Sequence, residues 1–320
     1  MTTIGACRLC NGPLSAPFLA IADQPPANGL CPSEEAARTA ERYPLVVLRC
    51  LDCGSVQLKH TVSPQALFGA YPYRSSVSAS FRRHFENLAD RLAEAHPGPE
   101  KVAYDVGSND GHLVRSLRER GWEAHGVEPA AALAAEATAS GAPTLCGWWN
   151  VPTAQQLVEE HGRADVVTAL NVLAHAEDLR GLLRATRVAL KPRHGTFVGE
   201  VYYLPNLLRD GAWDTLYSEH LFSHHVRPLR RLLASEGFTL DHVEDVETHG
   251  GSIRFWAAFD RSPGLGVPNG TVWSHLDRER DEGLDDPWTY RAFGTRVKKA
   301  MGDLFTEVQR LRSLGLRVCG

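Results

Sequence analysis

The stretch Lys101-Val-Ala-Tyr-Asp-Val-Gly-Ser-Asn-Asp-Gly111 decides the fold of this chain. Residues 102–106 form a short apolar run rich in β-branched side chains, and residues 111–120 carry apolar side chains at helical spacing. The stretch therefore predicts a strand, a glycine turn and a helix. Gly107 and Gly111 would let a bound ligand approach the backbone closely, and the free amides at the helix start would favour an anionic group such as a carboxylate or phosphate.

The distance from this turn to Glu128 predicts that the ligand contains a ribose. Glu128 ends a second predicted strand, residues 123–128, and lies 21 residues after Gly107, where a carboxylate can accept hydrogen bonds from both ribose hydroxyls. The loop lacks the middle glycine of the dinucleotide fingerprint, and its two aspartates would repel a pyrophosphate. A cationic ligand fits better, and the loop resembles the first motif of class I methyltransferases, which bind S-adenosylmethionine. An ordinary glycine turn is the competing interpretation. The residues of this stretch assigned to the cofactor are Asp105, Gly107, Asn109, Asp110, Gly111 and Glu128.

Length and composition set the class of protein. The chain has 320 residues, 43% of them hydrophobic, which is enough for two domains with a full core. A net charge of −4 argues against a nucleic-acid surface. No apolar run approaches the ~20 residues of a membrane helix, and the N-terminus has no secretion signal. We expect a cytoplasmic monomer with no nucleic-acid or membrane partner.

Two C-x-x-C pairs predict a metal site near the N-terminus. Cys7 and Cys10 form the first pair, Cys50 and Cys53 form the second, and 39 residues lie between the two pairs. Four thiolates in two such pairs are typical ligands of a tetrahedral Zn²⁺ ion, and they leave no position for a catalytic water, so we interpret the ion as structural. A redox pair is the competing interpretation. The odd total of seven cysteines does not suggest a disulfide framework; the other three are Cys31, Cys146 and Cys319.

From residue 101 onward, predicted strands and helices alternate, which indicates a largely parallel sheet with helices on both faces. The predicted strands are 102–106, 123–128, 144–147, 165–172, 196–203, 238–246 and 252–259, and the predicted helices are 111–120, 130–140, 154–160, 178–190 and 226–236. A helix is also predicted at 81–95, before the sheet. Only five residues, 247–251, separate the last two strands, so these should form an antiparallel hairpin.

Ligands of such sheets bind outside the carboxyl ends of the strands. Asn171 and His175 follow the fourth predicted strand, so we expect Asn171 to contact the cofactor and His175 to donate to a substrate oxygen. A structural hydrogen bond to the backbone is the alternative for His175. Trp148 and Trp149 follow the third strand and either flank an adenine or belong to the core.

The segment after the fifth strand carries the chemically most suggestive residues. Tyr217, Glu219 and His220 stand within four residues of one another, with further histidines close behind. We expect a loop that cannot bury all of these groups. An imidazole titrates near neutrality, so His220 is the candidate general base, with Glu219 placed to orient or polarise it. A second metal site is the rival interpretation, which the spacing of these groups disfavours.

A junction rich in hydroxyl groups precedes the central sheet. It runs from Tyr71-Pro-Tyr73 through the serines of residues 75–80. These side chains either line a polar pocket that faces the cofactor or form a solvated connector.

Taken together, these motifs resemble the sugar C-methyltransferases of antibiotic deoxysugar pathways. The resemblance covers about residues 7–260 and rests on the order of the paired C-x-x-C motifs, Tyr-Pro-Tyr, Asp-Val-Gly-Ser-Asn-Asp-Gly, Asn-Val-Leu-Ala-His, Tyr-Ser-Glu-His and His-Gly-Gly-Ser-Ile-Arg254. It implies S-adenosylmethionine and a structural Zn²⁺, with a dTDP-linked 4-keto-deoxysugar as substrate that is methylated at carbon 3. It also implies that His220 removes the proton next to the ketone, with Tyr217, Glu219, His175 and Tyr73 around the sugar.

The resemblance implies a class I methyltransferase fold, a Rossmann-like seven-stranded sheet, with a small N-terminal zinc-binding domain. We expect the zinc-binding domain at residues 1–80 and the methyltransferase domain at 81–262. Residues 288–314 predict a long amphipathic helix, after which Leu316-Arg-Val-Cys319 resembles the first strand of a further α/β domain, so residues 263–320 look like the truncated start of that domain. A methyltransferase of another small-molecule class and a non-catalytic binding fragment are the alternative functions.

Overall fold

A seven-stranded sheet forms the centre of the computed structural model, which describes residues 1–68, 73–259 and 269–318. Its strand order is β12-β13-β10-β9-β6-β7-β8. The strands are β6 (Lys101–Val106), β7 (Trp122–Glu128), β8 (Thr144–Cys146), β9 (Val166–Leu170), β10 (Thr196–Tyr202), β12 (Phe238–Val246) and β13 (Ser252–Phe259). The five strands from β6 to β10 run parallel, whereas β13 pairs antiparallel with both β10 and β12. The predicted terminal hairpin is confirmed.

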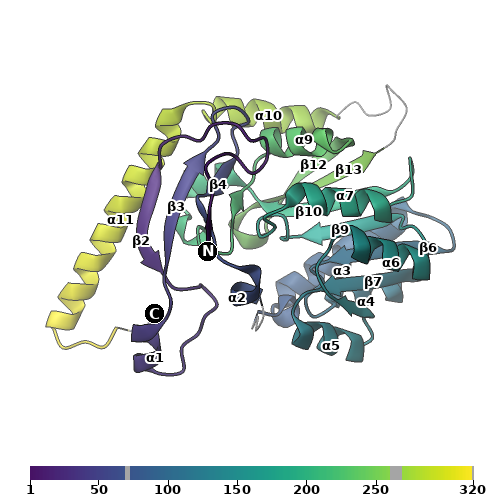
Figure 1. The fold of residues 1–320 in the computed structure, drawn as a ribbon, viewed down its shortest axis with the longest axis horizontal. Coiled ribbons are helices and arrows are strands. Elements are labelled where there is room, and N and C mark those ends of the chain that lie inside the picture. Colours follow the sequence, from purple (N-terminus) through teal and green to yellow (C-terminus); the bar gives the residue numbers. More distant parts are fainter. Residues whose placement is uncertain (69–72, 260–268, 319–320) are drawn as a thin grey trace.

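Helices cover both faces of this sheet (Figure 1). Alternate residues of β6 point to opposite faces, so Ala103 packs with the core under α3 and α4, whereas Val102 and Tyr104 pack with the core under α6, α7 and α9. The helices of this region are α3 (Ala79–Ala95), α4 (His112–Glu119), α5 (Ala131–Ala139), α6 (Val151–His161), α7 (Leu179–Ala189), α8 (Leu204–Asp210) and α9 (Val226–Ser235). This is the predicted Rossmann-like architecture.

The N-terminal region forms a second sheet beside the first (Figure 1). This sheet has the order β11-β4-β3-β2, with all its neighbours antiparallel. Its strands are β2 (Leu19–Gln24), β3 (Tyr43–Arg49), β4 (Val56–Leu58) and β11 (Phe222–Ser223). The strand β11 is far in sequence from the other three strands and follows directly after the segment that holds His220. The small elements nearby are β1 (Thr2–Thr3), β5 (His60–Thr61), α1 (Glu34–Thr39) and α2 (Pro64–Phe68).

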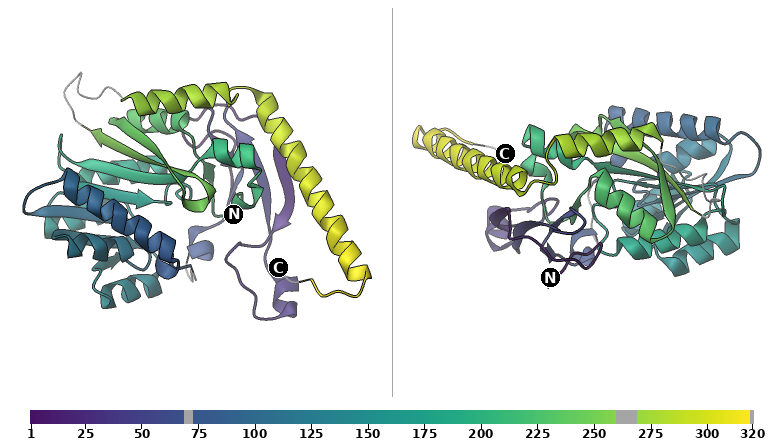
Figure 2. Two further views of the ribbon diagram at one scale, coloured as in Figure 1. Left: turned by 180° about the vertical axis from the view of Figure 1, so that it is seen from behind. Right: turned by 90° about the horizontal axis from the view of Figure 1, so that it is seen from above.

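Two helices end the chain. Helix α10 (Gly270–Asp281) packs against β12, and the long helix α11 (Pro287–Ser313) runs along the outside of the N-terminal sheet, as both views in Figure 2 show. The first half of α11 is anchored by Tyr290, Phe293 and Val297, which are buried. Within the residues that the structure describes, no helix is both long and apolar enough to span a bilayer.

The expectation of a strand at the C-terminus is wrong. Residues 316–318 have no regular secondary structure, and Cys319 lies outside the described residues. The described part of this segment follows Gly315, has no strand beside it and is exposed. Part of the predicted junction, Tyr71 and Pro72, and the predicted domain end at residue 262 also lie outside the described residues.

Candidate functional site

The glycine turn after β6 has the backbone that only small residues adopt easily. Gly107 and Gly111 have φ angles of +66° and +75°, and Asn109 between them has a φ of +52°. A Cβ added at Gly107 would lie 2.7 Å from Val172 Cγ2, and one at Gly111 would lie 2.5 Å from Ala142 Cβ. Both glycines are therefore required by the local packing and by their left-handed backbone conformation.

The two carboxylates that flank the turn are buried and hydrogen-bonded. Thr168 Oγ1 donates to Asp105 Oδ1 at 2.6 Å, and burial raises the pKa of Asp105 to about 7. Glu128 accepts from the backbone N–H groups of Asn109, at 2.9 Å, and Ala130, at 2.8 Å, while burial raises its pKa. Each carboxylate oxygen has a second lone pair. Glu128 can therefore accept further hydrogen bonds, and its contact with a ribose stays a prediction.

A small cavity opens between this turn and the hydroxyl-rich junction. Its lining includes Ser75, Asp105, Gly107, Ser108 and Asp110. In this cavity wall, Ser108 Oγ and Asp110 Oδ1 are buried without a hydrogen-bond partner. Buried acceptors of this kind suit the ammonium and hydroxyl groups of S-adenosylmethionine, so the residues present fit the cofactor.

The junction does reach the cofactor turn. Ser76 Oγ and its backbone N–H donate to Asp110 Oδ2, at 2.6 and 3.1 Å, and the backbone N–H of Ser75 donates to Asn109 Oδ1 at 3.0 Å. Asn109 Nδ2 in turn donates to the backbone oxygen of Tyr73 at 3.1 Å. Ser75 and Ser76 therefore cover the glycine turn after β6. The backbone of Tyr73 lies beside this turn, and its side chain is partly exposed.

The other predicted cofactor residues lie where β9 and β8 end. Asn171 has a left-handed backbone, with a φ of +59°, and its N–H donates to the carbonyl of Glu200 at 2.8 Å. Trp149 is packed near Tyr104, and its Nε1–H donates to Thr186 Oγ1 at 3.2 Å, so it belongs to the core. Trp148 is 44% exposed and has an edge contact with Phe68.

His220 lies between a phenol and a backbone carbonyl. Its Nδ1 is 2.8 Å from the carbonyl oxygen of Thr215, and its Nε2 is 2.9 Å from Tyr217 Oη. A carbonyl oxygen only accepts, so Nδ1 carries the proton, and in a neutral ring Nε2 then accepts the Tyr217 O–H. The base nitrogen of His220 is therefore fixed as Nε2 by its surroundings.

His175 contacts His220 directly. The two rings meet edge to face with centroids 4.9 Å apart, and His175 Nδ1 donates to the carbonyl oxygen of Glu219 at 3.0 Å. This is the backbone hydrogen bond weighed above as the alternative for His175. It orients the ring toward the other predicted substrate residues and leaves Nε2 as its basic nitrogen.

The expectation that His220 titrates near neutrality is wrong. Burial, reinforced by the neighbouring His175, lowers the pKa of His220 to about 3, and burial lowers the pKa of His175 to about 4. The physical cause is desolvation of the imidazolium form. Both rings are therefore neutral at physiological pH.

The segment around His220 is also more enclosed than expected. Glu219 is 1% exposed, and the following His224 and His225 are 3% and 1% exposed. These residues lie shortly before and directly after β11, which joins the edge of the N-terminal sheet, a pairing that the sequence pattern did not predict. Asn28 Nδ2 donates to both carboxylate oxygens of Glu219, at 3.0 and 3.1 Å. Asn28 and Thr215 are thus functional candidates that sequence reasoning missed, and no motif marks either of them.

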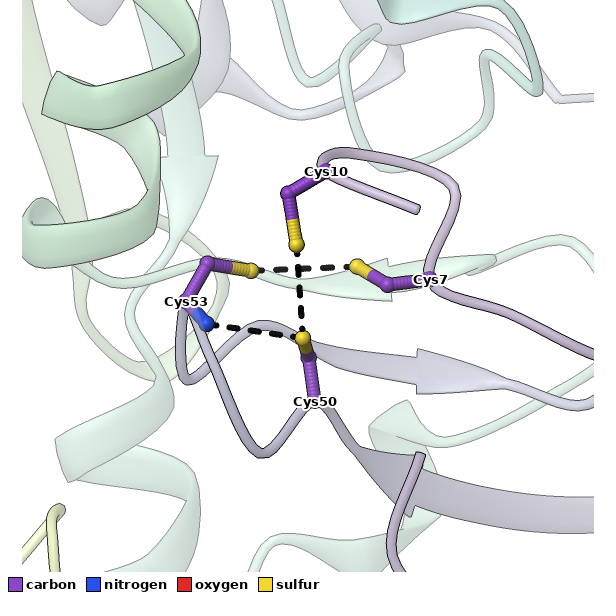
Figure 3. A group of neighbouring side chains, drawn as sticks. All are labelled: Cys7, Cys10, Cys50 and Cys53. Atoms are coloured by element: carbon purple, nitrogen blue, oxygen red, sulfur yellow. Dashed lines mark hydrogen bonds between the residues drawn. The ribbon is translucent and has the colours of Figure 1, made fainter. Parts of the chain in front are cut away.

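The four predicted zinc ligands converge (Figure 3). Cys7 Sγ is 3.7 Å from Cys53 Sγ, Cys10 Sγ is 3.5 Å from Cys50 Sγ, and all four sulfurs lie within 4.8 Å of one another. Tetrahedral Zn²⁺ with Zn–S bonds of about 2.3 Å places its sulfurs about 3.8 Å apart, whereas a disulfide would need about 2.05 Å. The donor set fits a structural Zn²⁺, and the redox-pair interpretation is not supported.

Family models match three parts of this chain. A family model for a methyltransferase domain matches residues 79–243, more than half of the chain. The chain belongs to the S-adenosylmethionine-dependent methyltransferases. A zinc binding domain model matches residues 7–68, and a C-methyltransferase C-terminal domain model matches residues 247–320. This methyltransferase therefore combines the three parts in one chain, and it binds S-adenosylmethionine and a structural Zn²⁺.

Individual methyltransferases are also similar to this chain. C-methyltransferase NovU from Streptomyces niveus is 29% identical over 318 residues, which are 99% of this chain and 75% of that protein. Among solved structures, the S-adenosylmethionine complex of magnesium protoporphyrin IX methyltransferase from Synechocystis PCC 6803 is 15% identical and covers 55% of this chain and 78% of its own, with a TM-score of 0.42. The CcbJ methyltransferase from Streptomyces caelestis is 14% identical and covers 55% and 90%, with a TM-score of 0.44.

The C-terminal region differs from the sequence prediction. The sequence predicts that residues 263–320 are the truncated start of a further domain, but the C-methyltransferase C-terminal domain model matches the chain from residue 247 to residue 320. That interpretation is wrong. The described elements of the matched region are the hairpin strand β13 and the helices α10 and α11.

Proposed function

We propose that this C-methyltransferase adds a methyl group to carbon 3 of a dTDP-linked 4-keto-deoxysugar, in a pathway of antibiotic or related natural-product biosynthesis. The similarity to NovU supports C-methylation as the reaction class. The sugar, the nucleotide and the steps below are the proposal.

The observation that carries the proposal is the hydrogen-bonded pair of Tyr217 and His220. The pair joins a neutral imidazole, whose Nδ1–H is held by the Thr215 carbonyl, to a phenol at 2.9 Å from Nε2. Carbon methylation next to a ketone needs a base for the carbon-bound proton and a donor for the enolate oxygen. Transfer to an oxygen or nitrogen nucleophile forms no enolate, so it would have little use for the donor of this set.

In the proposed step, His220 Nε2 takes the proton from carbon 3. The electron pair of the broken C–H bond forms the C3–C4 double bond, and the carbonyl π electrons move to oxygen 4. Tyr217 Oη, released from Nε2, then donates to the enolate oxygen, with His175 and Tyr73 as further candidate donors. Bound S-adenosylmethionine supplies an electrophilic methyl group on a sulfonium.

The low pKa of His220 is consistent with this role. A buried imidazole with a pKa of about 3 is unprotonated at pH 7 and is always able to accept. Forming an imidazolium in that environment is costly, but the enolate gains its negative charge in the same step, and the two opposite charges stabilise each other at short range. Proton transfer therefore depends on the substrate being in place.

The experiment that tests the proposal is solvent deuterium exchange at carbon 3 of a dTDP-4-keto-deoxysugar with S-adenosylhomocysteine present. We expect wild-type protein to catalyse exchange and His220→Asn to abolish both exchange and methyl transfer, while S-adenosylhomocysteine binding stays nearly unchanged. His194→Asn, at an exposed position, is the matched control and should exchange like wild type.

Each alternative function predicts a different result. Full turnover in His220→Asn would remove His220 from the mechanism. If wild-type protein binds S-adenosylhomocysteine but catalyses no exchange, the substrate belongs to another small-molecule class or the chain only binds its ligands.

A further inference from the structure

A second cluster of metal-ligand side chains lies on β7 and α6, away from the four cysteines. Residues of a strand alternate between its two faces, and Trp122 and Ala124 of β7 pack in the core under α3 and α4. Glu123 and His125 therefore point to the opposite face, where α6 lies. His161, the last residue of α6, completes the group.

The donor atoms of these three residues converge. His161 Nδ1 is 3.0 Å from Glu123 Oε1, His125 Nε2 is 3.5 Å from the same oxygen, and one ligand atom from each residue lies within 4.8 Å of the other two. Two ligands bound to one ion at 2.0–2.2 Å are typically about 3.2–3.6 Å apart. The donor atoms are thus close enough to bind one ion once the stacked rings of His125 and His161 turn so that their in-plane lone pairs converge.

The two imidazoles are held face to face at this point. Their ring centroids are 3.7 Å apart with an interplanar angle of 22°. His125 Nε2 is buried, and its contact with Glu123 Oε1, at 3.5 Å, is too long for a well-formed hydrogen bond. A buried ring nitrogen without a well-formed hydrogen bond is uncommon, because burial costs it the hydrogen bonds it would make to water. A bound ion would satisfy this nitrogen.

We propose that Glu123, His125 and His161 form a binding site for a divalent transition-metal ion of the Zn²⁺ class. Two imidazole nitrogens and one carboxylate oxygen suit ions of intermediate softness, such as Zn²⁺ and Ni²⁺, and not Ca²⁺ or Mg²⁺, which prefer oxygen ligands. Glu123 is half exposed, so solvent water fills the remaining positions. The ion would connect β7 to the end of α6.

This site is independent of the proposed reaction. Glu123 and His125 lie in the first half of β7, whereas Glu128 ends that strand at the cofactor turn. The ligands share no residue with the four cysteines or with the His220 group. The site can therefore be occupied or empty without a change in either of them.

The test is calorimetric titration of Ni²⁺ into the zinc-loaded full chain at pH 7.5, with zinc measured in the filtrate. We expect wild-type protein to bind one additional ion, with a Kd on the order of micromolar, and to retain its zinc. His161→Ala and Glu123→Gln should each weaken this binding at least tenfold. Glu123→Gln keeps the size of the side chain, so weaker Ni²⁺ binding by this variant would reflect the lost carboxylate and not a change in packing.

His194→Ala removes an exposed histidine outside the cluster and is the matched control, so it should bind the additional ion like wild type. The proposal is overturned if the zinc-loaded wild type takes up no additional Ni²⁺, or if Ni²⁺ only replaces zinc. Unchanged uptake by both cluster variants would also overturn it.

Discussion

At the scale of single residues, the hydrogen bonds of His220 determine what it can do. The Thr215 carbonyl fixes the proton on Nδ1, so only Nε2 can act as a base. Burial lowers the pKa of the ring by favouring its neutral form. The same surroundings thus set both the tautomer and the charge of the candidate base.

This burial gives a prediction for the pH dependence of activity. An exposed histidine with a pKa of about 6.5 would lose its basic form as the pH falls through that value. Because burial lowers the pKa of His220 to about 3, its neutral form persists at lower pH. Because burial raises the pKa of Asp105 in the cofactor turn to about 7, the test uses saturating S-adenosylmethionine. Under that condition we expect kcat for methyl transfer to stay nearly flat between pH 7 and 5, measured with protein whose circular dichroism shows it is folded. A tenfold loss across that range in folded protein would contradict this.

Sequence reasoning found the residues with distinctive chemistry but missed their partners. Tyr217 and His220 are three residues apart and form one hydrogen-bonded pair, as their proximity suggested. Asn28, by contrast, is separated from Glu219 by 191 positions, and an asparagine in a polar loop carries no pattern that identifies such a contact. The pKa of His220 was also misjudged, because burial depends on the complete fold.

At the scale of elements, helix α11 depends on one close approach. Gly294 packs directly on the backbone carbonyl of Phe18, just before β2, and a Cβ there would overlap that oxygen. The ring of Tyr290 packs beside that of Phe18 at a tilt of 53°, with ring centroids 5.2 Å apart. The first half of α11 therefore fits against the N-terminal sheet only because residue 294 has no side chain.

Gly294→Ala should consequently destabilise the protein. The carbonyl is backbone and cannot rotate away, so α11 must shift, at a cost of about 1–3 kcal/mol in the free energy of unfolding. Chemical denaturation measures this. Gly302→Ala is the control, since that glycine lies in the same helix with open space around its Cβ position, and it should stabilise by about 0.5–1 kcal/mol. Equal effects of the two substitutions would contradict this account of the contact.

Elements with strong periodicity were predicted well, whereas short or irregular ones were not. All seven strands of the central sheet and helix α11 lie within a few residues of their predicted bounds, because each has a clear apolar pattern. The helix α10 was missed, and its buried residues include His275 and Glu279, which do not form an apolar stripe. The terminal strand was predicted from local β-propensity, and no neighbouring strand is present beside its described residues.

At the scale of the whole molecule, the zinc site and the His220 segment share one sheet. Gln57 of β4 donates through Nε2 to Cys7 Sγ at 3.1 Å, and its backbone lies opposite Phe222 of β11. The backbone N–H of Leu58 donates to the carbonyl of Leu221, the residue after His220. The zinc ligand Cys7 is thus connected to the neighbour of His220 through two adjacent residues of β4, Gln57 and Leu58.

Cys50→Ser should therefore affect more than metal content. We expect loss of the zinc and lower thermal stability, because an ion bound only by the folded state stabilises it. We also expect increased hydrogen exchange of the Leu58 amide, which mass spectrometry can follow. Cys31→Ser, at an exposed cysteine outside the site, is the control. Unchanged zinc content in Cys50→Ser would contradict the four-cysteine site.

The pairing of β4 with β11 also bears on how this protein can be taken apart. The matches to the zinc binding domain and the methyltransferase domain are separated between residues 68 and 79, which suggests a boundary for exchanging the zinc-binding part with that of a relative. The edge strand of the N-terminal sheet, however, is β11, residues 222–223, which belongs to the methyltransferase part of the chain. A chimeric enzyme would therefore need β4 and β11 from the same parent. The N-terminal segment has to be exchanged together with residues 222–223 and not alone.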